Sequence, residues 1–333
     1  MRALVISGGG SKGAFAGGVS QYLIEELKHK YDLYLGTSTG SLLISHLALN
    51  KTEKIKDIYT SVNQKSIFNN CPFTVKKTKH GQMEIAINHI NVLKNLVLGR
   101  KTFGESKNLR KLISKALSID EFEDLQNSAE DIIVTVSNFS LNQVEYKSIN
   151  DFEYDDFCDW IWISCNYTPF MSLVNKQGCE YADGGFGSVV PIEEAIKRGA
   201  TVIDVIVLET EVTHLNRMPS KNAFSLMTNM HSFMADSIEK QNIRIGKFVA
   251  SNNDVIINFY YTPTVLTTNS LIFNQDRMKQ WWEIGFEYAK RKNIYKLANY
   301  KINCDNLDKE DILEKIIKHL KIFTFVEGCI IGI

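Results

Sequence analysis

Short apolar runs alternate along the chain with longer segments in which apolar residues recur every three or four positions. The short runs are rich in β-branched residues and predict strands at 3–7, 33–35, 132–136, 145–148, 161–164, 202–208 and 255–259. The longer segments predict helices at 14–28, 41–49, 55–62, 108–117, 192–198, 224–250, 276–292 and 309–320. This alternation is typical of a mostly parallel sheet with crossover helices, so the pattern predicts an α/β fold.

The chain shows no linker rich in proline and serine and no internal repeat, which favours one continuous domain. Residues 65–104 lack a strong hydrophobic period, and we expect them to form a cap or lid over a site. The stretch 255–275 is uncharged but contains a proline and several asparagine and threonine residues. It is therefore too polar to be predicted as a membrane span.

Composition and charge exclude some classes of protein. Of the 333 residues 44% are apolar, and 38 basic residues offset 38 acidic ones, which excludes an intrinsically disordered chain. A domain that binds nucleic acid normally carries a basic excess, so no nucleic-acid partner is expected. The chain begins with a strand pattern instead of a signal peptide, and we expect a cytoplasmic protein.

The cysteines and carboxylates indicate no metal site. The six cysteines form no CxxC pair and have no histidine at metal-ligand spacing, which argues against zinc. Six thiols in a chain of this length are too sparse for a disulfide framework. No carboxylate cluster has the spacing of a calcium loop, so activity without calcium is expected.

A glycine-rich turn separates the first predicted strand from the first predicted helix. Its residues are Gly8, Gly9, Gly10, Ser11, Lys12 and Gly13. Glycines let the backbone turn tightly and direct N–H groups toward an anion. The run fits the dinucleotide pattern GxGxxG, but that site needs an acidic residue after the second strand, and none follows residues 33–37. The Walker pattern also fails, because no Ser or Thr follows a Gly-Lys pair here.

A GxSxG pattern follows the second predicted strand and places Ser38 between Gly36 and Gly40. The strand, the turn and the apolar helix after it are typical of a nucleophile elbow, a strained turn that exposes the serine hydroxyl. Because parallel strands end at the same edge of a sheet, we expect the two glycine-rich loops to lie together. Ser38 would then attack a carbonyl carbon while N–H groups at positions 8–10 stabilise the oxyanion.

A serine nucleophile needs a base within hydrogen-bond reach. The outstanding acidic residue is Asp183, because Gly184 and Gly185 allow its backbone to approach another loop closely. The ordinary pKa of aspartate is about 3.9, so burial must raise that pKa before the group becomes a competent base. Histidine is the alternative base. Three histidines follow Asp183 in the order of an α/β-hydrolase triad: His214, His231 and His319.

These three motifs, in this order, resemble those of the patatin-like phospholipase family. The glycine-rich run is similar to the family's oxyanion motif, Ser38 lies in its nucleophile motif, and Asp183 begins its DGG or DGA motif. The resemblance implies a three-layer α/β/α fold with a central, mostly parallel sheet and a nucleophile elbow. It also implies a Ser-Asp dyad, with Ser38 as nucleophile and Asp183 as base, and no cofactor.

The resemblance implies a catalytic core at 1–210, and we expect 211–333 to form a mainly helical extension packed on the same domain. It further implies hydrolysis of fatty acyl esters through an acyl-enzyme, of phospholipase A or lysophospholipase type. The expected partner is a phospholipid or another fatty acyl ester at a peripheral membrane surface. Three lysines, Lys76, Lys77 and Lys79, form the best local basic candidate for contact with that surface.

Two other functions stay open at this point. One is an esterase or lipase with a Ser-His-Asp triad. The other is a non-catalytic nucleotide-binding or scaffold protein, in which the glycine-rich loop holds phosphate and Ser38 only caps a helix. The sequence also departs from the family at Cys165, Asn166 and Tyr167, where smaller residues usually precede the proline, and this bears on the shape of the acyl pocket.

Overall fold

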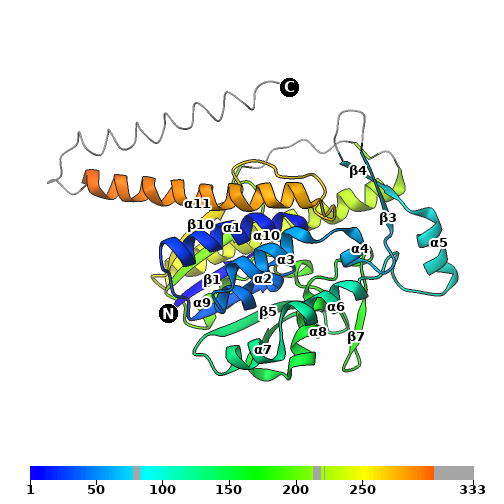
Figure 1. The fold of residues 1–333 in the computed structure, drawn as a ribbon, viewed down its shortest axis with the longest axis horizontal. Helices are drawn as coiled ribbons and strands as arrows, with labels where there is room; N and C mark the ends of the chain where they lie inside the picture. The colour runs from blue at the N-terminus through cyan, green and yellow to red at the C-terminus, as the bar shows by residue number, and fades with distance from the viewer. Residues whose placement is uncertain (78–82, 213–218, 221, 304–333) are drawn as a thin grey trace. The chain divides into compact units, whose positions relative to one another are not determined.

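The computed structural model describes residues 1–77, 83–212, 219–220 and 222–303 (Figure 1). The chain divides into two compact units, Met1–Glu287 and Tyr288–Ile333. The central sheet and the candidate site both lie in the first unit. Among the helices that the structure describes, none is long and apolar enough to cross a membrane.

A mixed sheet of mostly parallel strands forms the centre of the first unit. Its strands, in spatial order, are β10 (Ile256–Tyr261), β9 (Val202–Val207), β1 (Arg2–Ile6), β2 (Leu33–Thr37), β5 (Asp131–Asn138), β8 (Cys179–Asp183) and β7 (Val174–Lys176), and β6 (Gln143–Ser148) also pairs with β5. The five strands from β10 to β5 are parallel to one another, whereas β6, β7 and β8 pair in the antiparallel sense. The predicted α/β fold is confirmed.

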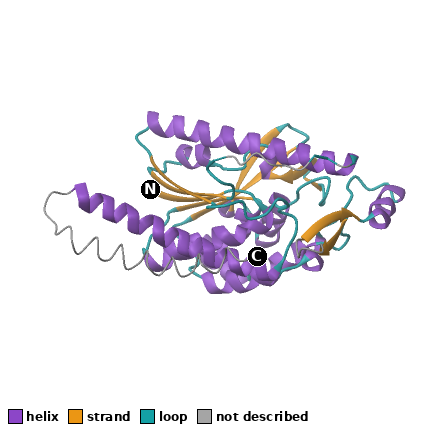
Figure 2. Cartoon of the chain, turned by 90° about the horizontal axis from the view of Figure 1, so that it is seen from above, coloured by secondary structure: helices purple, strands orange, loops and turns teal. Residues whose placement is uncertain are grey.

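Helices lie on both faces of this sheet (Figure 2). Two of them, α9 (Ile192–Lys197) and α10 (Ala223–Asn252), pack on the face that carries Val5. The opposite face carries Ile6 and meets α2 (Thr39–Ala48). The remaining helices are α1 (Gly13–Gln21), α3 (Thr52–Ser61), α4 (Gln64–Ile67), α5 (His89–Val97), α6 (Lys107–Ala116), α7 (Ile119–Gln126), α8 (Tyr154–Ser164) and α11 (Gln275–Asn303).

One predicted strand is wrong. Residues 161–164 form the last turn of helix α8 instead of a strand. The run is apolar because Trp160, Ile161 and Ile163 are all buried, and a short apolar run in a buried helix has the same pattern as a buried strand. The helix predicted at 309–320 lies outside the described residues.

Residues 65–104 contain more regular structure than their weak pattern indicated. Within them lie α4, α5 and an antiparallel pair, β3 (Phe73–Lys77) and β4 (Met83–Ile87), separate from the main sheet. Several short elements elsewhere, α7, β7 and β8, were not predicted either. The role of 65–104 as a cap, and the boundary near 210, stay predictions.

Candidate active site

Ser38 lies in a sharp turn between β2 and α2. Its backbone has φ 53° and ψ −120°, a conformation that is strained for a residue with a side chain and that exposes the hydroxyl at the helix start. The flanking glycines permit this turn. A Cβ on Gly36 would lie 2.5 Å from the carbonyl carbon of Gly40, and one on Gly40 would lie 2.4 Å from the carbonyl oxygen of Ile6. Neither position has room for a side chain.

Strand register brings Asp183 to the same place. On one edge of β5, Thr37 of β2 pairs with Thr135, and Asp183 of β8 pairs with the next residue, Val136. Strand β6 pairs with the other edge of β5, so β8 pairs with β5 on the same edge as β2, directly after the end of β2. As a result the Ser38 Oγ donates a hydrogen bond of 2.6 Å to Asp183 Oδ2.

The environment of Asp183 favours its protonated form. The residue is only 3% exposed, and this burial raises the pKa of its carboxyl group to about 7. Hydrogen bonds from Ser38 Oγ and, at 2.8 Å, from the Gly185 N–H act in the opposite direction. A carboxyl group with this pKa is an effective proton acceptor near neutral pH, unlike an ordinary aspartate.

The glycine-rich loop meets this pair, but most of its N–H groups donate elsewhere. Gly8 donates to the Val189 carbonyl at 3.2 Å, and Ser11 donates to the Ser270 carbonyl at 2.8 Å. The N–H groups of Lys12 and Gly13 bond to carbonyls within the loop itself. Only the Gly9 and Gly10 N–H groups lack a partner among the residues that the structure describes.

Charged side chains surround the Lys12 side chain beside this loop. The Lys12 ammonium group forms an ion pair with Glu209, which follows β9. Glu239 of α10 is 7% exposed, and burial raises the pKa of its carboxyl group to about 8, with repulsion from Glu209 adding to the shift. Because its ammonium group is already paired, Lys12 is better placed to hold the loop than to accept a proton.

A cavity of about 1120 Å³ adjoins the Ser38–Asp183 pair and the glycine-rich loop. One part of its wall is apolar and comes from α2, α3, α6, α8 and the segment after α8. Examples are Leu42, Ile58, Leu112, Ile113, Ile161 and Met171. Another part is polar and includes Glu239, Lys240 and Arg244 of α10. A ligand that fills this cavity therefore has a long apolar portion and a polar one.

Comparison with known proteins identifies the family. The family model described as patatin-like phospholipase matches residues 4–196, more than half of the chain. This chain belongs to the patatin-like phospholipase family. Membership supports a general lipid acyl hydrolase activity. No curated protein matches the chain. Among solved structures it is similar to VipD from Legionella pneumophila, at 16% identity and a TM-score of 0.44, covering 87% of this chain and 66% of that one.

The patatin-like domain supports the elbow with residues that sequence reasoning missed. Ser164, at the end of α8, accepts a hydrogen bond from the Ser38 N–H at 2.9 Å and donates one to the Thr135 carbonyl at 2.6 Å. Cys165 is buried, and its thiol lies 3.1 Å from the Ser38 carbonyl oxygen. The only signal in the sequence was the departure from the family pattern at Cys165.

Among the residues that the structure describes, no histidine hydrogen-bonds to the Ser38 hydroxyl, whose partner is Asp183. His231 of α10 bonds through Nδ1 to the Met227 carbonyl and packs against Tyr167 and Phe170. His46 is buried on α2 and bonds to the Ala116 carbonyl. The other two triad candidates, at 214 and 319, lie outside the described residues. Within the described ranges, no three His, Cys, Asp or Glu residues gather where they would hold a metal ion.

Proposed function

We propose that this patatin-like protein is a serine lipid acyl hydrolase with a Ser38–Asp183 dyad. The observation that carries the proposal is the 2.6 Å hydrogen bond from Ser38 Oγ to Asp183 Oδ2, at the wall of a cavity with a large apolar portion. A direct contact between nucleophile and carboxylate leaves no place for a histidine between them. The raised pKa of Asp183, about 7, fits a base in this position.

In the first half of the reaction, Ser38 Oγ attacks the ester carbonyl carbon and its proton passes to Asp183 Oδ2. The developing oxyanion accepts hydrogen bonds from the N–H groups of Gly9 and Gly10. Of the six residues predicted to form the oxyanion hole, these two are therefore the proposed donors, because the N–H groups of the other four bond to protein carbonyls. The bond between the carbonyl carbon and the alcohol oxygen then breaks. Asp183 returns its proton to the leaving alcohol, and the acyl group stays on Ser38.

In the second half, a water molecule attacks the acyl-serine carbonyl carbon while Asp183 accepts one of its protons. The bond to Ser38 Oγ breaks, the serine regains its proton, and a fatty acid leaves. The apolar wall formed by α2, α3, α6 and α8 suits the acyl chain, because burying each CH₂ group there contributes about 0.8 kcal/mol. We infer a phospholipase A or lysophospholipase type of activity at a membrane surface, without a metal or cofactor.

Fluorophosphonate labelling with peptide mapping tests the nucleophile. We expect label on Ser38 in the parent chain and none in Ser38→Ala. Release of fatty acid from phospholipid vesicles in a calcium chelator should fall by about 10²–10⁴-fold in Asp183→Asn. A matched control is Asp156→Asn, which changes an aspartate on α8 that contacts Lys176 and should leave the rate within about twofold.

Histidine variants separate the dyad from a triad. Alanine at His214, His231 or His319 should leave fatty acid release intact, and a loss of about 10³-fold in any one of them would instead support a Ser-His-Asp triad. A folded parent chain that takes no label and is stabilised by a nucleotide would contradict the hydrolase proposal. That result would favour a nucleotide-binding protein.

A further inference from the structure

Helix α5 exposes most of its apolar side chains and turns two polar ones toward the protein. Its asparagines face the protein, where Asn91 Nδ2 donates to the Cys71 carbonyl at 2.9 Å and Asn95 Nδ2 donates to the Thr102 carbonyl at 3.1 Å. Asn95 is only 1% exposed. A helix on the surface of a globular protein normally buries apolar side chains and exposes polar ones.

Apart from Val92, which is 7% exposed, the apolar side chains of α5 point to solvent. Ile90 is 80% exposed, Leu93 61% and Val97 77%, at a spacing of three and four residues that places them on one face. Leu96 and Leu98 are also more than half exposed. Contiguous exposed apolar surface of this kind marks an interaction site.

Helix α5 itself carries one basic side chain and no acidic one. Residues 85–104 contain no acidic side chain, and they carry Lys94, Arg100 and Lys101. Lys94 is exposed and has no ion pair with any residue that the structure describes, whereas Arg100 and Lys101 pair with Glu105 and Glu180. An exposed apolar helix face with an unpaired lysine beside it suits a lipid bilayer, in which anionic head groups cover an apolar interior.

Helix α5 also follows directly on a strand that lines the cavity beside Ser38. It follows β4 after one residue, and it lies beside the β3–β4 pair (Figure 1). Phe73 of β3 and Ile85 of β4 both line the cavity that adjoins Ser38. A surface that receives α5 is therefore close to one wall of the cavity.

We propose that the exposed apolar face of α5, formed by Ile90, Leu93, Leu96 and Val97 together with Leu98 directly after the helix, docks the protein on a lipid bilayer that contains anionic phospholipid. This rests on the proposed function in one respect, since a lipid acyl hydrolase takes its substrate from such a surface. The apolar side chains enter the boundary between head groups and acyl chains, and Lys94 meets the phosphates.

The size of the face favours a bilayer over a second copy of the chain. A fully exposed side chain of this kind offers roughly 100 Å² of apolar area. Five partly exposed side chains then offer less than about half of the ~800 Å² per partner that a stable dimer buries. Binding to a bilayer has no such threshold, because its strength grows with each apolar side chain inserted.

Co-sedimentation with vesicles tests this docking surface, with every chain carrying Ser38→Ala so that no lipid is consumed. The probe is vesicles of phosphatidylcholine and phosphatidylglycerol at about 3:1. We expect Leu93→Glu/Val97→Glu to lower the bound fraction at least about tenfold, and Leu93→Trp/Val97→Trp to raise it. The matched control, Ile119→Glu/Leu141→Glu, changes two exposed apolar residues that belong to α7 and to the turn between β5 and β6, and it should bind like the parent.

The same substitutions in the chain with Ser38 intact should leave hydrolysis of a soluble short-chain ester unchanged. Equal binding by the α5 variant and its control would overturn the proposal, and so would a parent chain that does not sediment with vesicles. A dimeric parent that becomes monomeric in Leu93→Glu/Val97→Glu would overturn it as well, by assigning the face to self-association. Vesicle binding that depends on α5, in a chain that hydrolyses no ester, would support docking and contradict the proposed function.

Discussion

Both oxygens of the Asp183 carboxyl group accept hydrogen bonds from uncharged donors, Ser38 Oγ and the Gly185 N–H. Desolvation outweighs these hydrogen bonds, and the pKa of Asp183 rises to about 7. At the scale of single residues this burial is what turns a weak base into a useful one. The same group also makes folding depend on pH.

The hydrolysis rate should follow the ionisation of Asp183. Only the carboxylate accepts the serine proton, so kcat/KM for a soluble ester should rise between about pH 6 and 8 and level off above the pKa of about 7. A pH–rate profile of the parent chain measures this rise. A rate that does not change across that range would contradict the assignment of Asp183 as base.

Stability should change with pH in the opposite direction. Because its pKa is raised, Asp183 binds a proton more tightly in the folded state than in the unfolded state, and this difference stabilises the folded state. The contribution is complete below about pH 4 and is lost as pH rises through about 7. Asp183→Asn should remove this contribution. We expect the Tm of the parent to fall more than that of the variant between about pH 4.5 and 8. If the Tm of the parent and of Asp183→Asn fell equally between these pH values, that result would argue against a raised pKa of Asp183.

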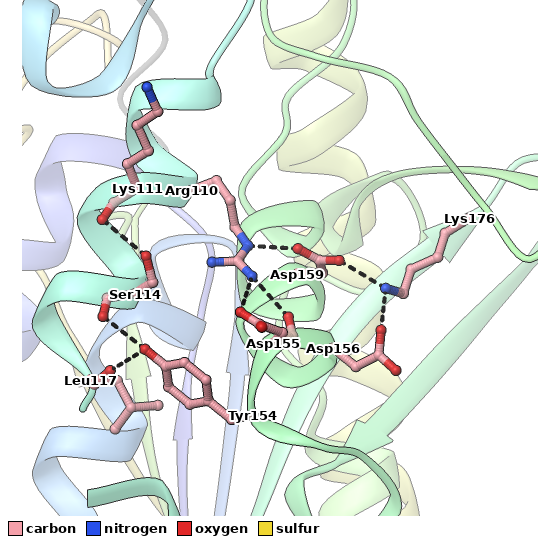
Figure 3. A network of polar contacts seen from close by, with 9 residues as sticks. All are labelled: Arg110, Lys111, Ser114, Leu117, Tyr154, Asp155, Asp156, Asp159 and Lys176. Atoms are coloured by element: carbon pink, nitrogen blue, oxygen red, sulfur yellow. Dashed lines mark hydrogen bonds and ion pairs between the residues drawn. The ribbon is translucent and has the colours of Figure 1, made fainter. Parts of the chain in front are cut away.

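At the scale of elements, a charged network joins α6, α8 and β7 (Figure 3). Arg110 of α6 donates to Asp159 at 2.6 Å and to Asp155 at 3.3 Å, both on α8. Lys176 of β7 bonds to Asp156 and Asp159 on the same helix. The network lies beside the apolar cavity wall, to which α6 and α8 both contribute. It also holds α8, whose last residue, Ser164, accepts the hydrogen bond from the Ser38 N–H.

Replacing Arg110 by methionine should lower the free energy of unfolding by about 1–2 kcal/mol, because the guanidinium group is partly buried and two aspartates on α8 lose a cationic partner. Urea unfolding measures the change, which should shrink in about 1 M salt. Lys197→Met removes an exposed pair with Glu193 and serves as control, with a change within about 0.5 kcal/mol. If Arg110→Met lost no more free energy of unfolding than Lys197→Met, the network would add no more stability than an exposed ion pair.

At the scale of the molecule, residues near the two ends of the first unit pack together. Trp282 of α11 is fully buried, and its Nε1 donates to the Gln21 side chain at 2.8 Å. A Cβ on Gly17 would lie 2.1 Å from the Trp282 ring, so this part of α1 must be glycine for the helices to meet. The family model matches only residues 4–196, yet the packing of α1 in the core of the first unit depends on Trp282, which lies beyond that range.

Trp282→Ala should therefore destabilise the whole first unit by about 3–5 kcal/mol, since it leaves a large cavity and removes the partner of the Gln21 side-chain oxygen. Calorimetry or urea unfolding measures the loss. Phe248→Ala, which removes an aromatic ring that is 67% exposed, is the matched control and should change stability by less than about 0.5 kcal/mol. A small effect of Trp282→Ala would mean that α11 contributes little to the core.

Local patterns determined much of the fold and of the candidate site. A strand, a glycine turn and a buried helix follow one another within a few residues, so Ser38 and the glycine-rich loop were recognisable from the order of residues alone. The strand β8 was missed because its short run, residues 179–183, mixes polar and apolar side chains. Residues 161–164 were misassigned because burial hides the helical period.

The sequence by itself therefore determined the order of most elements, the α/β class and the residue types of the site. Only the tertiary structure decided which of those residues meet. The pairing of Ser38 with Asp183 depends on the register of two strands on β5, and the pKa of Asp183 depends on how completely it is buried. The exposure of apolar side chains on α5 also depends on tertiary contacts, because the hydrogen bonds of Asn91 and Asn95 turn that side of the helix toward the protein. Hydrogen bonds and burial between distant segments depend on the packed chain, which no local pattern contains.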